Sequence, residues 1–150
     1  MKQPSFVWNE ETGTATCYLF YKDLTFEGVA KCHPQDQDFK SVMVGSDLAF
    51  MRAQVNYFNY VLKNEIKPEL TGLVKLYNAI SQSKKFNKDS YEARKMRRQI
   101  YELNTDYDNV KNFRDEIKLE IKKTIIEKEV FYQKLRETRA AQAKEVVKEG

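Results

Sequence analysis

The chain has 150 residues, 32% of them charged, and its mean hydropathy of −0.70 is polar for a globule but normal for long helices with one apolar face. This length suits one domain, or a small domain with an extended helix. Two cysteines are too few for a disulfide framework, the first residues lack the apolar core of a signal peptide, and no stretch approaches about 20 apolar residues. We therefore expect a cytoplasmic protein with reduced, half-buried thiols and no membrane span.

Charge is unevenly distributed along the chain, although the formal net charge is only +4. Residues 1–45 carry four lysines and six acidic residues, which leaves a net charge of +6 for the rest. Most of this excess lies in residues 84–98, the basic segment, which has two acids and seven bases: Lys84, Lys85, Lys88, Arg94, Lys95, Arg97 and Arg98. Such a cluster suits a phosphate-bearing ligand, and the alternative is a solvated helix start.

Residues 1–46 predict a small antiparallel sheet followed by a loop. Three stretches, 6–8, 14–21 and 24–32, have strand-forming composition and are separated by turn sequences. A tight turn at residues 22–23 would set Cys17 opposite Gly28, so the two cysteines would not pair. Gly28 in mid-strand predicts a bulge or a close approach of another backbone. Three such strands cannot stand alone, so we expect a helix on their apolar face.

Residues 47–83 predict a first long helix. Its apolar residues recur every three or four positions, and Ser46 or Asp47 is suited to cap its N-terminus. Pro68 lies inside this pattern, where it removes one backbone hydrogen bond and crowds the carbonyl of Asn64. Because the apolar pattern resumes beyond Pro68, we expect a kink rather than an end.

Residues 89–147 predict a second, longer helix, capped by Asp89 or Ser90. The sequence thus predicts an α+β fold in a single domain of residues 1–150: a small N-terminal β-meander followed by two long antiparallel helices that form a coiled-coil-like hairpin. At 1.5 Å per residue, the second helix exceeds the first by roughly 30 Å. Another copy of the chain is the natural cover for apolar residues of this overhang, so we expect a homo-oligomer.

A coiled-coil seam of apolar residues in steps of four and three begins at Met96 of the second helix. Arg114 occupies a seam position where an apolar residue is due. If it faces inward, its guanidinium needs a carboxylate or a ligand phosphate, because a lone buried charge is costly. The alternatives are an arginine whose charged end reaches solvent, or a pair with Glu65 or Glu69 that sets the register. Later seam positions hold Thr124, Lys128, Phe131 and Leu135.

Two further residues are candidates for ligand binding. Phe86 lies in the turn between the helices, among lysines and beside Asn87. A ring beside cations suits a nucleobase, and the alternative is a hydrophobic plug that closes the hairpin. Arg52 lies early in the first helix, where it either points into a pocket between sheet and helix or pairs with Glu27 or Asp47.

The sequence carries no signature of catalysis. His33 is the only histidine and the cysteines form no CxxC pair, so we expect no zinc site. Glycine-rich phosphate loops and nucleophile elbows are missing from the sequence. Asp36 and Asp38 form a carboxylate pair, but loop capping is the simpler role because no base or metal ligand accompanies them. We expect no enzyme, no metal site and no cofactor.

A short motif and the overall layout resemble a family of phage proteins. The motif comprises Phe26-Glu27-Gly28-Val29-Ala30-Lys31-Cys32-His33-Pro34 with Asp36, then Gly45-x-x-x-Ala49 and Arg52-Ala53. With a sheet followed by two long helices, it resembles the first type of Thoeris anti-defence protein. Those proteins are sponges, which bind the cyclic ADP-ribose-type signal made by the host's TIR enzyme and hold it without cleavage. This chain has a longer C-terminal helix than compact members of that family.

The resemblance implies site residues, partners and a location. Phe86 would stack on adenine beside Asn87, and Arg114 would bind a ribose or phosphate group. The other ligand-binding candidates are Lys31, Arg52, Arg94 and Arg97. The family's proteins assemble through their helices, with dimers combining into a hexamer, and some members hold cyclic trinucleotides at separate sites. The implied location is the cytoplasm of an infected host cell, and the implied pocket is closed by two protomers.

Two other interpretations stay open. A nucleic-acid-binding protein could use the basic segment with Phe86, Tyr91 and Tyr101. Three strands followed by a helix are similar to a double-stranded-RNA-binding domain, but residues 35–46 are acidic where that domain has a basic loop. A coiled-coil inhibitor or adaptor that binds a protein partner needs instead an exposed apolar or acidic face.

Overall fold

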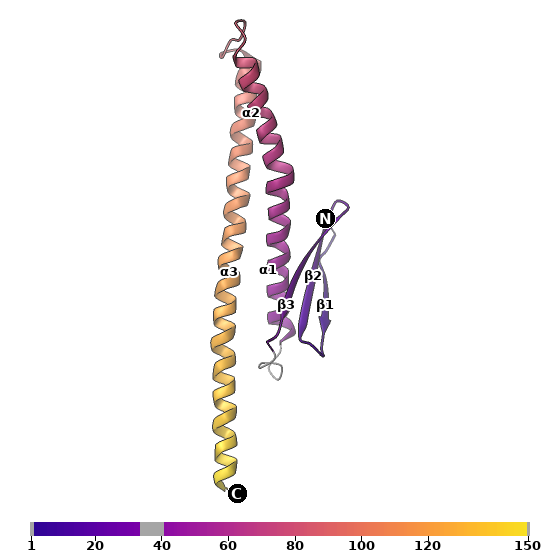
Figure 1. The fold of residues 1–150 in the computed structure, drawn as a ribbon, viewed down its shortest axis with the longest axis vertical. Helices are drawn as coiled ribbons and strands as arrows, with labels where there is room; N and C mark the ends of the chain where they lie inside the picture. The colour runs from indigo at the N-terminus through magenta and orange to yellow at the C-terminus, as the bar shows by residue number, and fades with distance from the viewer. Residues whose placement is uncertain (1, 34–40, 150) are drawn as a thin grey trace. The chain divides into compact units, whose positions relative to one another are not determined.

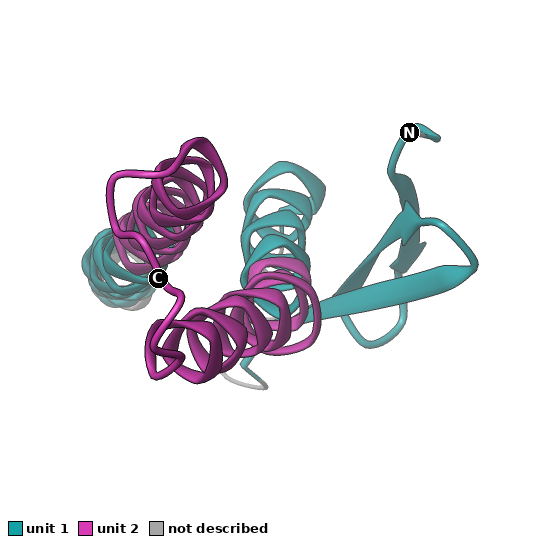
Figure 2. Cartoon of the chain, turned by 90° about the horizontal axis from the view of Figure 1, so that it is seen from above, with its two compact units in different colours: residues 1–56, 117–150 teal, residues 57–116 magenta. Residues whose placement is uncertain are grey.

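The computed structural model describes residues 2–33 and 41–149, with side chains through residue 146 (Figure 1). A three-stranded antiparallel sheet precedes two long helical segments, which confirms the predicted α+β fold. The chain divides into two compact units: unit 1 is Met1–Asn56 with Ile117–Gly150, and unit 2 is Tyr57–Glu116 (Figure 2). The predicted loop with Asp36 and Asp38 lies outside the described residues.

The sheet of unit 1 has its three strands in sequence order: β1 (Ser5–Asn9), β2 (Thr14–Tyr21) and β3 (Leu24–Lys31). A two-residue turn joins β2 to β3, and Lys22 in this turn has a φ of 54°. Such a short turn fixes the pairing of the strands. Cys17 lies opposite Gly28, so the predicted register is confirmed. Neither cysteine is in a disulfide, and both are buried rather than half-buried as expected.

The first helical segment begins earlier than predicted. α1 spans Val42–Tyr60, so Ser46 and Asp47 lie inside the helix and neither caps it. Ser41 does so instead, because its Oγ accepts the backbone N–H of Val44 at 3.3 Å. Val44 also packs against the core, and this burial outweighs the weak helix propensity of a β-branched residue.

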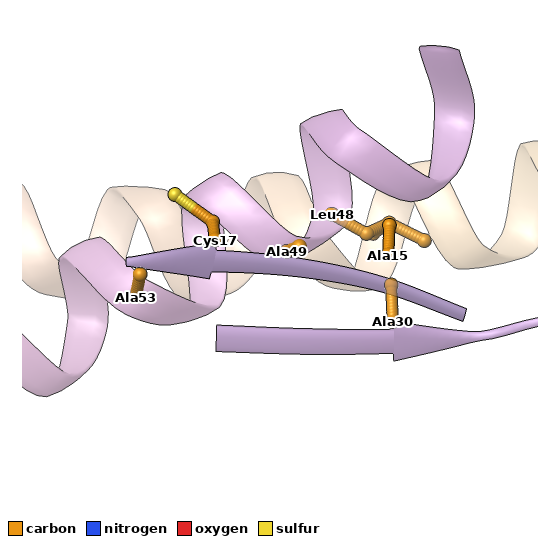
Figure 3. Close-up of a cluster of buried hydrophobic side chains, with 6 residues drawn as sticks. All are labelled: Ala15, Cys17, Ala30, Leu48, Ala49 and Ala53. Atoms are coloured by element: carbon orange, nitrogen blue, oxygen red, sulfur yellow. The ribbon is translucent and has the colours of Figure 1, made fainter. Parts of the chain in front are cut away.

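Small side chains bring α1 close to the sheet in unit 1 (Figure 3). A Cβ at position 28 would lie 2.0 Å from the carbonyl oxygen of Ala49 and 2.3 Å from the nitrogen of Ala53. The predicted close backbone approach at Gly28 is therefore confirmed, and no other residue fits there. The buried cluster around this contact consists of Ala15, Cys17, Ala30, Leu48, Ala49 and Ala53, and Ile121 and Ile125 of the second long helix pack against it.

The first helical segment continues through Pro68. α1 passes into a π-helical stretch, η2 (Val61–Ile66), and then into α2 (Lys67–Ser81), with Pro68 in the first turn of α2. The N–H of Lys67 bonds the carbonyl of Leu62, five residues back, so the backbone is already wider than an α-helix where proline removes a donor. The predicted irregularity is present as a π-helical turn.

Ser90 caps the second helical segment, α3 (Tyr91–Glu149). Its Oγ accepts the N–H of Ala93 at 3.2 Å, and its carbonyl accepts that of Arg94 at 3.0 Å. Of the two predicted caps, Ser90 is therefore the right one. Asp89 instead donates its backbone N–H to the side-chain oxygen of Asn87, in a local turn just before the cap.

Unit 2 is an antiparallel helical hairpin. Phe58 meets Phe113, and Tyr77 meets Arg97, so earlier residues of one arm contact later residues of the other. The predicted seam residues of α3, including Arg114, are partly buried along this hairpin. Farther along α3, in unit 1, the buried residue is Tyr132 with 2% exposure, whereas the predicted Phe131 is 58% exposed. The predicted seam was therefore wrong by one residue at that position.

Candidate functional site

One hollow of unit 1 combines a predicted site residue with other polar groups. It is an open groove of about 300 Å³ formed by β3, α1 and α3, which we call the sheet–helix groove. Arg52, Asn56 and Lys118 line it with polar side chains, and Val55 and Ile121 add apolar surface. The strand contributes Glu27, Gly28 and Val29.

Two of these side chains tie α1 to the outer edge of β3. Arg52 Nη1 donates to the carbonyl oxygen of Val29 at 2.7 Å, and Asn56 Nδ2 donates to that of Glu27 at 2.7 Å. Because β3 is an edge strand, these bonds satisfy carbonyls that no neighbouring strand reaches. Arg52 thus lies in a sheet–helix pocket, the first of its two predicted positions, and it donates to a backbone carbonyl rather than to a carboxylate.

The charges of the groove favour an anion. A guanidinium has five N–H donors, and Arg52 uses one of its two Nη1 donors on Val29, so others are left for a ligand. Lys118 and Glu27 are exposed, and neither forms an ion pair within the part of the chain that the structure describes. Two cations therefore face one carboxylate, and a phosphate group is favoured over a cationic ligand.

Lys118 was not among the predicted site residues. It lies one helical turn before Ile121, which packs on the core of unit 1. The seam pattern could have placed Lys118 beside that face. It could not show that this part of α3 lies against β3 and α1, because that contact joins residues about 60 to 90 positions apart in the chain.

Phe86 closes the end of the helical hairpin in unit 2. Its ring meets that of Tyr77 edge to face, with 5.8 Å between centroids and 88° between planes. Arg97 Nη1 donates to the hydroxyl of Tyr77 at 2.9 Å, so one tyrosine joins the turn to α3. Phe86 is half-buried by this arrangement. The contact favours the predicted plug, and the ring keeps some accessible surface.

The remaining turn residues are more exposed. The side-chain oxygen of Asn87 is occupied by the N–H of Asp89. Arg94 is exposed on α3, and Lys31 is exposed at the end of β3, outside the groove lining. The bases of the basic segment form no ion pair within residues 2–33 and 41–149, and the partner of Arg97 is the neutral hydroxyl of Tyr77.

Arg114 has partners within its own hairpin. Its Nη1 donates to Asn59 Oδ1 at 3.0 Å, and its Nε and Nη2 both donate to Asp115 Oδ1 at 3.1 Å. Its side chain is 20% exposed, so this charge in the seam is neutralised close to solvent. The neutralising carboxylate is that of Asp115, rather than that of Glu65 or Glu69 as one prediction had it.

The predicted residues of unit 2 do not converge on one site within a single chain. Arg97 and Phe86 meet through Tyr77, but Arg114 lies 17 residues beyond Arg97, about 26 Å along α3. A hollow of about 260 Å³ lies between α2 and α3, and its charged lining residues are the acids Glu69, Glu102 and Asp106. That hollow repels phosphate groups. The sheet–helix groove of unit 1 is therefore the stronger candidate.

Other kinds of site are not indicated among the described residues. No group of three His, Cys, Asp or Glu side chains there is placed to hold a metal ion. A membrane span is likewise not found, since none of the described helices is long and apolar enough. Comparison with protein-family models, with curated proteins and with solved structures finds no match.

Proposed function

We propose that the protein sequesters, without cleaving it, an anionic cyclic nucleotide of the cyclic ADP-ribose type. The observation that carries the proposal is the pair of cations, Arg52 and Lys118, in one groove with an amide and apolar surface. The α+β layout of a sheet followed by two long helices supports the resemblance to phage anti-defence sponges. On this proposal the protein acts in the cytoplasm of an infected host cell.

The groove has the chemistry that a nucleotide pyrophosphate needs. Arg52 is held in place by its bond to Val29, so little side-chain freedom is lost when a phosphate binds. Lys118 adds a second charge from another helix, and Asn56 leaves its side-chain oxygen for a ribose hydroxyl. Val55 and Ile121 offer apolar surface to the sugar or base.

The size of the groove argues for a pocket shared between protomers. Pockets for whole ligands of this class have volumes of about 300–1,000 Å³, and the groove is open and at the lower limit. It would take a phosphate and part of the adjoining sugar. A second copy of the chain would supply the rest, with Phe86, Asn87 or Arg114 as candidates, in a dimer or hexamer. This assembly also explains why Phe86 and Arg114 need not meet within one chain.

Retention of intact ligand is the direct test. Purified protein is incubated with cyclic ADP-ribose isomers and desalted, then heated, and the released small molecules are separated by chromatography. We expect an intact isomer from the wild type. Lys118→Glu should retain at most about one tenth of the ligand that the wild type retains, since it places a carboxylate beside the phosphate. Lys122→Glu is the matched control, because it makes the same charge change on the same helix outside the groove.

Two outcomes would reject the proposal. One is the absence of any retained isomer or cyclic oligonucleotide in the wild type. The other is release of a linear, hydrolysed product, which would mean that the protein is an enzyme. Equal loss of retained ligand in Lys118→Glu and Lys122→Glu would show that the ligand binds outside the groove.

A further inference from the structure

The outer face of α3 in unit 2 carries aromatic and basic side chains that the fold does not use. At about 100° per residue, Tyr91, Arg94, Arg98 and Tyr101 fall within one arc of the helix. The partly buried Met96, Ile100 and Leu103 lie on the opposite side. Tyr91 is 68% exposed and Tyr101 is 72% exposed, so both rings are largely in water. We call these four residues the outer stripe.

Local stability does not explain the charges of this stripe. Arg94 and Arg98 are four residues apart, so their like charges are neighbours on the helix and oppose its formation slightly. Neither forms an ion pair within the described chain, although Glu102 follows Arg98 by one turn. Three exposed lysines of the adjoining turn, Lys84, Lys85 and Lys88, carry the same sign and are likewise without an ion pair there. Residues 84–98 carry seven bases and two acids, Asp89 and Glu92, so the surface has a net positive charge.

We infer that the outer stripe and the adjoining turn bind single-stranded nucleic acid. Exposed aromatic rings beside cations stack on bases while the cations contact phosphates, whatever the sequence of the strand. Tyr91 and Tyr101 are ten residues apart, about 15 Å along the helix, which spans about four stacked nucleotides at 3.4 Å each. Stacking requires unpaired bases, so a duplex should bind more weakly.

This surface is independent of the sheet–helix groove. The four residues of the stripe all lie in unit 2, whereas the groove lies entirely in unit 1. Binding of nucleic acid can therefore be tested separately from the proposed function. Tyr91→Ala with Tyr101→Ala should weaken binding of a single strand and leave retention of cyclic ADP-ribose unchanged.

Fluorescence anisotropy with a labelled oligothymidylate about 15 nucleotides long tests the inference over a series of salt concentrations. The double variant Tyr91→Ala, Tyr101→Ala should bind at least roughly 30-fold more weakly, since each of the two lost base stacks contributes about 1–3 kcal/mol. Arg94→Ala with Arg98→Ala should make the slope of log K against log salt about 1.4 units shallower, because each phosphate contact on a single strand adds about −0.7. Neither tyrosine lies in the buried core, and circular dichroism confirms that each variant is folded.

Lys122→Ala with Lys123→Ala is the matched control, because it removes the same charge from exposed positions of α3 outside the stripe. The inference predicts that this control binds the strand like the wild type. It is overturned if the control and the Arg94, Arg98 variant weaken binding equally, if the tyrosine variant binds as tightly as the wild type, or if a duplex of equal length binds more tightly. Binding of anionic lipid vesicles without binding of the oligonucleotide would also overturn it.

Discussion

Replacing Gly28 by alanine should separate α1 from the sheet. The added Cβ would lie 2.0 Å from the carbonyl oxygen of Ala49 and 2.3 Å from the nitrogen of Ala53. Both are backbone atoms of α1, so no side-chain rotation can relieve the clash. Moving these atoms to even a tight contact of about 3.0 Å requires the helix and the strand to shift apart by about 1 Å.

The free-energy loss has two parts. Overpacking of a core costs about 1–3 kcal/mol. The shift also breaks the 2.7 Å bonds from Arg52 and Asn56, because their acceptors are the carbonyls on either side of Gly28. Each such bond contributes about 1 kcal/mol, and the charged one more. We therefore expect Gly28→Ala to lower the free energy of unfolding by about 3–6 kcal/mol, a large part of the about 5–15 kcal/mol of a typical domain.

Urea unfolding followed by tryptophan fluorescence measures this loss. Trp8 is the only tryptophan and packs against the same cluster, so it reports on unit 1. With a urea dependence of about 2 kcal/mol per molar, the midpoint should fall by about 1.5 M or more. Gly72→Ala is the control, followed by circular dichroism: nothing lies within 4 Å of its Cβ, and alanine should stabilise α2 by up to about 1 kcal/mol. A midpoint for Gly28→Ala within about 0.3 M of wild type would refute the reasoning.

The remaining predictions concern caps, the seam, the turn and the thiols. Ser90→Ala should cost about 1 kcal/mol in thermal unfolding, whereas Ser46→Ala should cost little, and the reverse order would contradict the assigned caps. Arg114→Leu should leave the melting temperature unchanged or raise it, because it removes a partly buried charge whose partners can be solvated. A fall of several degrees would show that the bonds to Asn59 and Asp115 contribute more stability than burial of the charge costs. Phe86→Ala should lower the free energy of unfolding by about 2 kcal/mol through loss of the Tyr77 contact, measured by urea unfolding, and an unchanged value would exclude the plug. Burial raises the pKa of the Cys17 thiol above its ordinary 9.0, so native protein at pH 8 should react slowly with a thiol reagent. The free energy of unfolding should fall as the pH rises beyond about 9, because only the unfolded chain ionises readily there. Fast reaction of both native thiols would contradict this.

Periodicity and turn chemistry predicted most of the fold. The two-residue turn between β2 and β3 leaves one register, so the pairing of Cys17 with Gly28 followed directly. The steps of three and four along both helices fixed their existence and approximate ends. The local sequence did not decide which residue caps each helix. Ser41, which was not among the predicted caps, takes the place of Ser46 or Asp47 because burial of Val44 extends the helix toward its N-terminus, and burial depends on the sheet.

The candidate site was less accessible to sequence reasoning. Arg52 was found because it follows a motif and lies near the strands. Lys118 was missed because its place in the groove depends on a contact between distant parts of the chain. Arg114 was correctly placed in the seam, but its partner is the adjacent Asp115, a pairing that helical spacing does not predict. Phe86 was selected because it is an aromatic residue among lysines, but its contact with the ring of Tyr77 is seen only in the structure.

Native mass spectrometry in the presence of cyclic ADP-ribose isomers tests the central claim most directly, because it reports the number of protomers and the mass of the bound ligand together. We predict an oligomer that carries ligand of unaltered mass, with none on monomers, and a lower occupancy in Lys118→Glu than in Lys122→Glu. Ligand bound to the monomer would contradict a shared pocket. An oligomer that binds no ligand, or one that carries a hydrolysed product, would contradict sequestration itself.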